Sequence, residues 1–154
     1  MKILVISVHP DDETLGCGGT ILKHRKNGDD LYWLIVTNVS TEFGYSDERV
    51  RTREIEIGKV SKEYGFIDMK ILGYKPSGLN SENQHQLIED VSEIMTEIKP
   101  EVIYLINRSD AHSDHRYAFN ACIANTKSFR HPYINKVLMY ECLSETEYAP
   151  QFTE

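Results

Sequence analysis

The chain begins with the stretch MKILVISVHPDDE (residues 1–13), in which an apolar run gives way abruptly to polar and charged side chains. Lys2 to Val8 is rich in Ile and Val, which is typical of a strand buried on both faces of a sheet. The run is short for a secretion signal, and HPDDE stands where a small-residue cleavage site would be needed. We therefore interpret the stretch as a first strand followed by a polar loop.

Outward from this stretch, strand-like and helix-like segments alternate. We expect strands at residues 2–8, 31–38, 66–72, 102–106 and 136–140, and helices at residues 14–27, 46–64, 86–99 and 114–127. Gly28 and Gly65 stand where the glycines that end helices belong. Alternation of this kind implies right-handed βαβ units. The predicted fold is an α/β, doubly wound (Rossmann-like) three-layer sandwich with a mostly parallel sheet, its first five strands in the order 3-2-1-4-5.

The composition argues against several classes of protein. The length of 154 residues suits one domain, which we expect to span residues 1–154. The net charge is −7 and no basic block is present, so nucleic acid is not expected as a partner. The longest apolar runs are strand-sized, which predicts no membrane span. Cys17, Cys122 and Cys142 follow no CxxC pattern, so we expect reduced core thiols in a cytoplasmic protein.

The predicted topology indicates where a ligand would bind. Open α/β sheets bind ligands beyond the carboxyl ends of their strands, at the point where the strand order reverses. In this order the reversal lies between the first and fourth strands. The two segments densest in His and Asp, residues 9–13 and 110–115, follow those two strands. We therefore expect these distant segments to meet in space.

Three residues of these segments form a suitable ligand set for zinc. Catalytic zinc sites use three protein ligands and leave one position for water. His9 and Asp12 lie three residues apart on a tight turn, and His115 would supply the third ligand. Water bound to such an ion has a pKa near ~7, which makes a nucleophile available at neutral pH. With ligand bonds of about 2.0–2.1 Å, we expect the nitrogens of His9 and His115 to lie within about 5 Å of each other even without metal.

Neighbouring side chains could complete a hydrolytic site. Asp11 would remain ionised beside a dication and could act as the general base. His112 could stabilise the oxyanion of a tetrahedral intermediate. Asp114 could hydrogen-bond a ring nitrogen of His112, orient the ring and favour the imidazolium. Such a set of groups suits the hydrolysis of an amide or an ester.

Less specific interpretations exist for the same residues. A single His after a strand is more often a loop or core residue than a ligand, and Asp-Asp after a strand is often a turn and helix cap. Gly16, Gly18 and Gly19 could admit a phosphate. Close packing of the first helix on the sheet explains these glycines better, and they do not form the GxGxxG pattern. The occurrence of His and Asp at both sides of the predicted crevice is what favours a metal site.

The two motifs together resemble those of the PIG-L, or LmbE-like, family of zinc-dependent de-N-acetylases. The resemblance rests on HPDDE at residues 9–13 and HSDH at residues 112–115, a pair that is highly specific in this order and on this pattern of elements. It runs from Met1 to the end of the chain. It includes Arg51 and Glu54, spaced as R-x-x-E, and the Tyr-Glu pair that follows the fifth strand.

The resemblance implies zinc held by His9, Asp12 and His115. It implies Asp11 as the general base, later protonating the leaving amine, and His112 as the oxyanion stabiliser, oriented by Asp114. The family typically removes acetyl from N-acetylglucosamine-type sugars. The implied substrate is therefore a small-molecule or carrier-linked N-acetylated sugar, and a homo-oligomer is among the options for assembly.

The substrate-binding arginine is open to two assignments. The resemblance implies that Arg51 binds substrate. A helical wheel built on Val50, Ile57 and Tyr64 instead places Arg53 nearer the buried edge of the second helix. Either residue could also be an ordinary solvent-exposed cation.

The resemblance also implies further elements beyond the fifth strand, which cover the sheet and shape the substrate pocket in longer relatives. The residues SETE (144–147) resemble a mid-sequence segment of those relatives. We therefore hypothesise that this chain is a fragment or a truncated product.

Three competing functions remain. A catalytically impaired sugar-binding module could keep the same fold and metal. A phospho-receiver domain also places an acidic pair after its first strand. It needs a phosphorylated Asp after the third strand, and here that strand is followed by Gly73 and Tyr74. A Rossmann dehydrogenase lacks support because the glycine fingerprint is missing.

Overall fold

In the computed structural model, which describes residues 1–149, five strands form one parallel sheet in the order β3-β2-β1-β4-β5. The predicted fold class and strand order are confirmed. The strands are β1 (Lys2–Ser7), β2 (Asp30–Thr37), β3 (Asp68–Tyr74), β4 (Val102–Ile106) and β5 (Lys136–Tyr140). The principal helices are α1 (Asp12–Asn27), α2 (Asp47–Tyr64), α3 (Gln84–Ile98) and α4 (Ser113–Ala124).

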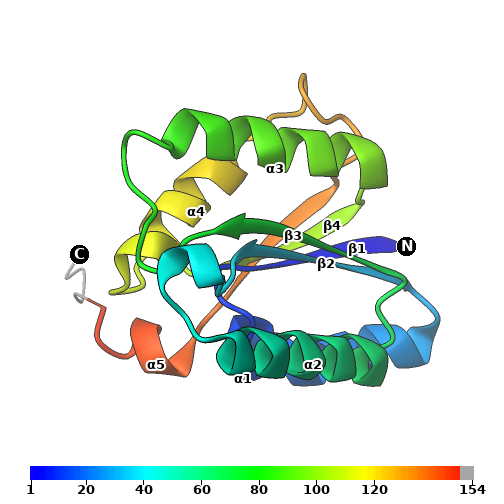
Figure 1. The fold of residues 1–154 in the computed structure, drawn as a ribbon. Coiled ribbons are helices and arrows are strands. Elements are labelled where there is room, and N and C mark those ends of the chain that lie inside the picture. Colours follow the sequence, from blue (N-terminus) through cyan, green and yellow to red (C-terminus); the bar gives the residue numbers. More distant parts are fainter. Residues whose placement is uncertain (150–154) are drawn as a thin grey trace.

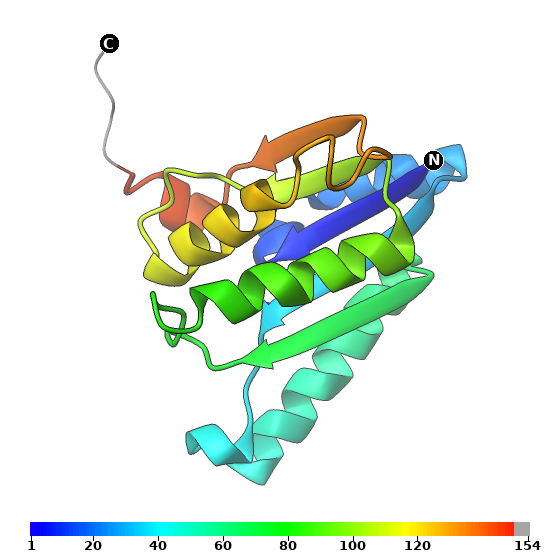
Figure 2. The same cartoon turned by 90° about the horizontal axis from the view of Figure 1, so that it is seen from above.

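The helices lie in two layers, one on each face of the sheet (Figures 1 and 2). α1 and α2 cover one face, and α3 and α4 cover the other. β1 lies at the centre, where Ile3, Leu4 and Val5 are completely buried. Burial of these apolar side chains on both faces is the main contribution that holds the layers together.

The helix ends follow the predicted signals. Gly28 and Gly65 both adopt the left-handed conformation after α1 and α2, and each donates its backbone N–H to carbonyls of the last helical turn. At the start of α2, the Ser46 side chain accepts a hydrogen bond from the Arg49 amide. Both helices therefore end at these glycines, and the chain then turns back to form the next strand of the sheet.

Two short helices escape prediction. Thr41–Phe43 forms a 3₁₀ turn, and α5 (Leu143–Thr146) follows β5. Segments of three or four residues contain too little sequence for an apolar period to be recognised. α4 also ends earlier than predicted, at Ala124, where the buried side chain of Asn125 donates to the carbonyls of Ile88 and Ala121.

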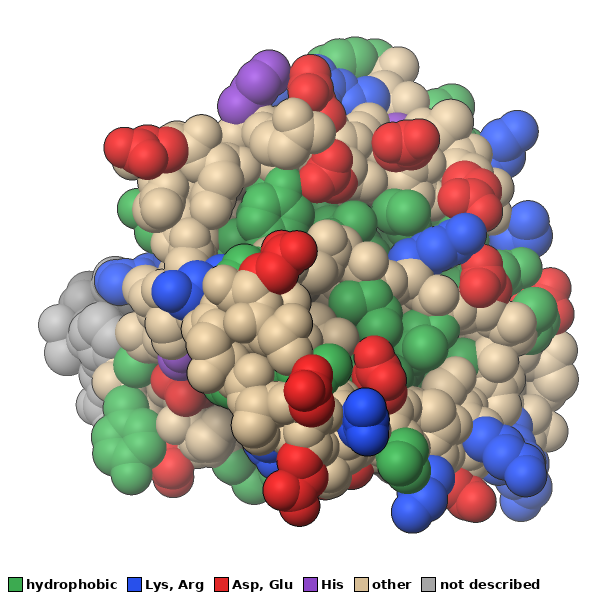
Figure 3. All heavy atoms as spheres, viewed as in Figure 1, with side chains coloured by type: hydrophobic (Ala, Val, Ile, Leu, Met, Phe, Trp, Pro, Cys, Tyr) green, Lys and Arg blue, Asp and Glu red, His purple; other side chains and the backbone are tan. Residues whose placement is uncertain are grey.

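The surface carries both signs of charge (Figure 3), and two of the three glycines at the start of α1 are closely packed, whereas Gly19 is not. Acidic and basic side chains are interspersed over the face shown in Figure 3. Within residues 1–149, no helix is both long and apolar enough to cross a bilayer. A side chain at Gly16 would collide with the Tyr140 ring, and one at Gly18 would collide with the Tyr64 hydroxyl. Close packing of α1 therefore accounts for these two glycines.

Candidate metal centre

The loops that follow β1 and β4 meet at the carboxyl edge of the sheet. β1 and β4 are adjacent, with Ile3 opposite Val102 and Val5 opposite Tyr104. Residues 9–12 and 110–115 therefore leave the sheet side by side, as the topology predicts. Asp12 is the first residue of α1, and His115 lies in the first turn of α4.

Three ligand-type atoms converge where these loops meet. His9 Nδ1 lies 3.2 Å from His115 Nε2 and 3.9 Å from Asp12 Oδ2. The distance between His115 Nε2 and Asp12 Oδ2 is 3.5 Å. Donors bound to one tetrahedral zinc ion at about 2.0–2.1 Å are separated by about 3.3 Å. The predicted approach of His9 to His115 is confirmed, and the spacing of the three atoms fits one such ion.

The hydrogen bonds around the two histidines favour one tautomer of each neutral ring. His115 Nδ1 donates to Asp110 Oδ2 at 2.8 Å, and His9 Nε2 donates to Asp114 Oδ2 at 3.2 Å. In these tautomers, each neutral ring turns a lone pair toward the other. Two such lone pairs repel unless a proton or a metal cation lies between them. A carboxylate hydrogen-bonded to the far nitrogen of each ring is the usual support for a metal-binding His.

Asp12 is anchored by the backbone. Its Oδ2 accepts hydrogen bonds from the amides of Val8 and His9, at 2.9 and 2.8 Å. Burial raises the pKa of Asp12, although His115 and the His9 amide oppose the increase. Burial lowers the pKa of His115, but the Asp110 hydrogen bond and the charge of Asp12 outweigh it and raise that pKa above its usual value. A buried carboxylate beside two imidazoles favours a bound cation.

The expected contact between the Asp114 carboxylate and His112 does not form. Instead, the Asp114 amide donates to His112 Nδ1 at 3.1 Å. The Asp114 carboxylate contacts His9 and accepts the amides of Ser77 and Leu79, at 2.6 and 3.1 Å. The carboxylate points away from His112 because these three donors satisfy it on the other side. Asp114 therefore orients His9, a candidate metal ligand, and holds the loop between β3 and α3.

This arrangement favours a neutral His112. Burial and the neighbouring His9 lower the pKa of His112. Because Nδ1 accepts the Asp114 amide, the neutral ring carries its proton on Nε2. The structure therefore contradicts the expected imidazolium form of His112. The Nε2–H group of the neutral ring takes no part in the hydrogen bond with the Asp114 amide. His9, His112 and Asp114 also group as ligand-type residues, but hydrogen bonds already engage the Asp114 carboxylate.

A cavity of about 320 Å³ adjoins the three ligand-type residues and is also lined by Asp11, His112 and Glu145. Asp11 occupies the N-cap position of α1, but among the described residues its side chain caps no helix amide. It is not the helix cap that Asp-Asp pairs often provide, and its exposed carboxylate borders the cavity.

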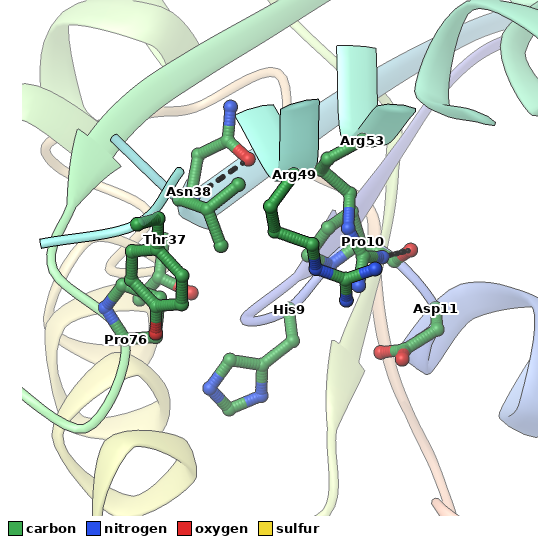
Figure 4. Close-up of a pocket in the computed structure, with 10 residues that line it drawn as sticks. His9, Pro10, Asp11, Thr37, Asn38, Arg49, Arg53 and Pro76 are labelled. Carbon is green, nitrogen blue, oxygen red and sulfur yellow. Dashed lines mark hydrogen bonds between the residues drawn. The ribbon is translucent and has the colours of Figure 1, made fainter. Parts of the chain in front are cut away.

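A second cavity of about 260 Å³ shares His9, Asp11 and Pro76 with the first. Figure 4 shows Arg49 and Arg53 extending from α2 toward the loop that carries His9 and Pro10. The two cavities therefore form adjoining parts of one cleft, with the candidate metal ligands at one end and two guanidinium groups at the other.

Arg53, rather than Arg51, faces this cleft. Arg53 donates to the carbonyl of Pro10 at 3.2 Å, lies 3.6 Å from Glu56, and its side chain is 17% exposed. Arg51 is exposed on α2 and, in the described part of the chain, lines neither cavity. The R-x-x-E spacing occurs twice in this helix, and the helical wheel correctly places Arg53 at the buried edge. The assignment of substrate binding to Arg51 finds no geometric support because its side chain points to solvent.

Several residues of the site were not assigned a role from the sequence. Asp110 is completely hidden beneath His115, Cys142 is buried beside Asp12, and Thr146 contacts Asp110. Asp110 belongs to the His- and Asp-rich segment at residues 110–115, so the sequence indicated that it lies near the site. Cys142 and Thr146 lie at the unpredicted helix α5, and no local pattern marks them.

The sheet order also separates the competing folds. Receiver domains have the order 2-1-3-4-5, whereas this sheet has the order β3-β2-β1-β4-β5. The acidic pair therefore sits beside the His-rich loop after β4, and the receiver interpretation is wrong.

Comparison with known proteins agrees with this geometry. A family model described as PIG-L, GlcNAc-PI de-N-acetylase, matches residues 4–125. A protein of Bacillus subtilis (strain 168) named "Probable N-acetyl-alpha-D-glucosaminyl L-malate deacetylase 2" is 30% identical over 108 residues, which are 66% of this chain and 49% of that protein. A diacetylchitobiose deacetylase of Thermococcus kodakarensis is 32% identical over 126 residues, 76% of this chain and 46% of the relative.

A solved structure shows the same fold. The N,N'-diacetylchitobiose deacetylase of Pyrococcus horikoshii superimposes with a TM-score of 0.73 at 22% identity, covering 90% of this chain and 60% of that one. The chain spans about half the length of the curated relatives it matches. Because the family model covers most of the chain and its matched region contains both loops of the candidate metal centre, the chain belongs to the PIG-L family.

Proposed function

We propose that this chain is a metal-dependent amide hydrolase that removes the acetyl group from an N-acetylated sugar. The observation that carries the proposal is the pair of imidazole nitrogens that face each other across 3.2 Å, beside the buried carboxylate of Asp12 and open to a cleft. His9, Asp12 and His115 would hold Zn²⁺. When bound, this ion supplies Lewis acidity and lowers the pKa of a coordinated water.

Asp11 is the proposed general base. Its carboxylate borders the cavity of the metal ligands and is not used as a helix cap. From this position it accepts a proton from the attacking water and then delivers it to the leaving amine. His112 lines the same cavity and donates from Nε2 to the oxygen of the acetyl carbonyl as negative charge develops there.

The polar end of the cleft is the proposed sugar site. Arg49, Arg53 and Asn38 line it together with the ring of Tyr45. Such donors and acceptors suit the hydroxyl groups of a sugar, and an aromatic ring suits its apolar face. The names of both curated relatives specify acetylated amino-sugar substrates. We therefore propose an N-acetylglucosamine-type substrate.

The test is acetate release by zinc-loaded protein from a panel of N-acetylated mono- and disaccharides. We expect release from at least one member, and Asp11→Asn is expected to retain zinc and reduce turnover by roughly 10²–10⁴-fold, the usual contribution of a general base. Sugar binding without acetate release by the wild type would instead identify a binding module and contradict the hydrolase proposal. Wild-type turnover by Asp11→Asn would contradict the role of Asp11.

A further inference from the structure

The short helix α5 contacts residues that support the candidate metal ligands. The Ala111 amide donates to the Glu145 carbonyl at 3.4 Å, which joins α5 to the loop that carries His112 and His115. Cys142, the residue before α5, is completely buried and directs its thiol toward Asp12 Oδ1 at 3.6 Å. Contacts from α5 and the residue before it thus reach both loops that provide the candidate ligands.

Thr146 makes the closest of these contacts. Its Oγ1 donates to Asp110 Oδ1 at 2.5 Å and accepts the Cys142 amide at 2.8 Å. Because the amide can only donate, the single hydroxyl proton of Thr146 is committed to Asp110. The orientation of this hydroxyl group is therefore fixed by the backbone of α5.

Asp110 links Thr146 to His115, so the fixed Thr146 hydroxyl also restricts the orientation of the His115 ring. Its other oxygen, Oδ2, accepts the His115 Nδ1 proton at 2.8 Å, and the side chains of both residues are completely buried. The carboxylate is held at one oxygen by Thr146 and at the other by the ring. A carboxylate fixed at both oxygens leaves the imidazole a single orientation, with Nε2 directed at His9.

We propose that Thr146 is a positioning residue for the metal centre, acting through Asp110 on the His115 ring. The inference depends on the metal-binding part of the proposed function and not on the identity of the substrate or on deacetylation. Partners behind a metal ligand typically contribute about 10- to 100-fold in metal affinity, because they set the direction of the ligand lone pair. The α5 turn is therefore part of the metal centre.

The experiment measures zinc affinity of the metal-free full chain by competition with a chromogenic chelator. Thr146→Val removes the hydroxyl at nearly constant shape, and Thr146→Ser restores it. Thr96→Val is the matched control, because Thr96 is an exposed residue of α3 whose hydroxyl, like that of Thr146, donates a hydrogen bond within the fold, here to the Ser92 carbonyl. Thermal unfolding of each metal-free variant reports on the fold separately from the site.

We expect Thr146→Val to bind zinc roughly 10- to 100-fold more weakly, with Thr146→Ser and Thr96→Val close to wild type. Wild-type affinity in Thr146→Val would overturn the inference, and so would an equal loss in the Val and Ser variants. If Thr146→Val does not fold, Thr146→Ala, which cannot introduce a clash, takes its place under the same criteria.

The outcomes also separate this inference from the proposed function. A wild type that binds zinc with Thr146-dependent affinity but releases no acetate supports the inference and contradicts the hydrolase. Acetate release together with a zinc affinity that does not depend on Thr146 supports the hydrolase and contradicts the inference about Thr146. A wild type that binds no zinc contradicts both.

Discussion

His115 Nε2 lies 3.2 Å from His9 Nδ1, although 106 positions separate the two histidines in the chain. Each ring is oriented by a carboxylate on its far side, Asp110 for His115 and Asp114 for His9. Neither ring can turn away without losing that hydrogen bond. The arrangement directs two ring nitrogens at one point, as the proposed divalent-cation site requires.

Replacement of His115 by Ala should therefore abolish stoichiometric metal binding. Wild-type protein is expected to carry about one zinc per chain, in keeping with a single three-ligand site. His85→Ala, at an exposed position of α3, is the control and should keep its zinc. Metal content after gel filtration, measured by mass spectrometry, checks this, and equal zinc in wild type and His115→Ala would contradict the ligand assignment.

Removing the metal from wild type should also lower the melting temperature, because an ion bound only by the folded chain stabilises it by mass action. A chelator added to His115→Ala should then cause little further change. A shift of the same size in both proteins would show that the chelator acts elsewhere.

Arg53 and Arg51 offer a matched pair for the substrate site. Arg53→Ala removes a guanidinium that lines the cleft, and loss of a charged hydrogen bond of about 1.5–3 kcal/mol corresponds to a fall in kcat/KM of roughly 10- to 100-fold. Arg51→Ala removes an exposed cation and should change kcat/KM less than about twofold. Steady-state kinetics on the panel substrate measure both, and a larger effect at Arg51 would reverse the assignment.

Gly16 and Gly19 should respond to alanine in opposite directions. A Cβ at Gly16 would lie 2.6 Å from the Glu141 carbonyl oxygen and collide with the Tyr140 ring, so Gly16→Ala should destabilise the protein by about 1–3 kcal/mol. At Gly19, apart from its chain neighbours and the adjacent backbone of α1, no atom of the described residues lies within 4 Å of the new Cβ. Gly19→Ala should stabilise the exposed helix by about 0.5–1 kcal/mol. Urea unfolding gives both values, and the same sign at both sites would refute the packing argument.

His131 should make stability depend on pH. Its side chain is buried between Ser92 and the Tyr133 hydroxyl, and burial, together with the nearby Arg130, lowers its pKa. The folded state therefore resists protonation of His131. Its contribution to stability is complete above the unfolded-state pKa of about 6.5 and is lost progressively as the pH falls below that value.

Urea unfolding of wild type and His131→Asn at pH 7.5 and 5.5 tests this linkage. The wild type should lose more stability on acidification than the variant. His85→Asn, at the exposed position of α3, should retain the wild-type pH dependence. An unchanged pH dependence in His131→Asn would show that His131 does not contribute.

The sequence predicts the fold well because its strands are nearly continuous apolar runs. The alternation predicts Val102–Ile106 and Lys136–Tyr140 with the bounds observed, and the strand order then brings His9 next to His115. These inferences need only periodicity and topology, which are encoded locally.

Contacts between individual side chains cannot be predicted from periodicity and topology alone. Asp114 is adjacent to His112 in the motif, yet its carboxylate turns toward His9 because the amides of Ser77 and Leu79 attract it from a distant loop. The helical wheel places Arg53 correctly because the direction of a helical side chain follows from its position alone. The role of Thr146 depends on a one-turn helix that no period reveals.

The position of β1 at the centre of the sheet has a consequence for biosynthesis. His9 and Asp12 are translated long before His115, and β1 gains its neighbour β4 only after β2 and β3 have been made. A nascent chain can therefore offer two of the three candidate ligands, and His115 joins them only after α4 has left the ribosome. Metal binding by all three proposed ligands would therefore come late in maturation, and it would stabilise only those molecules in which the middle of the sheet has been completed.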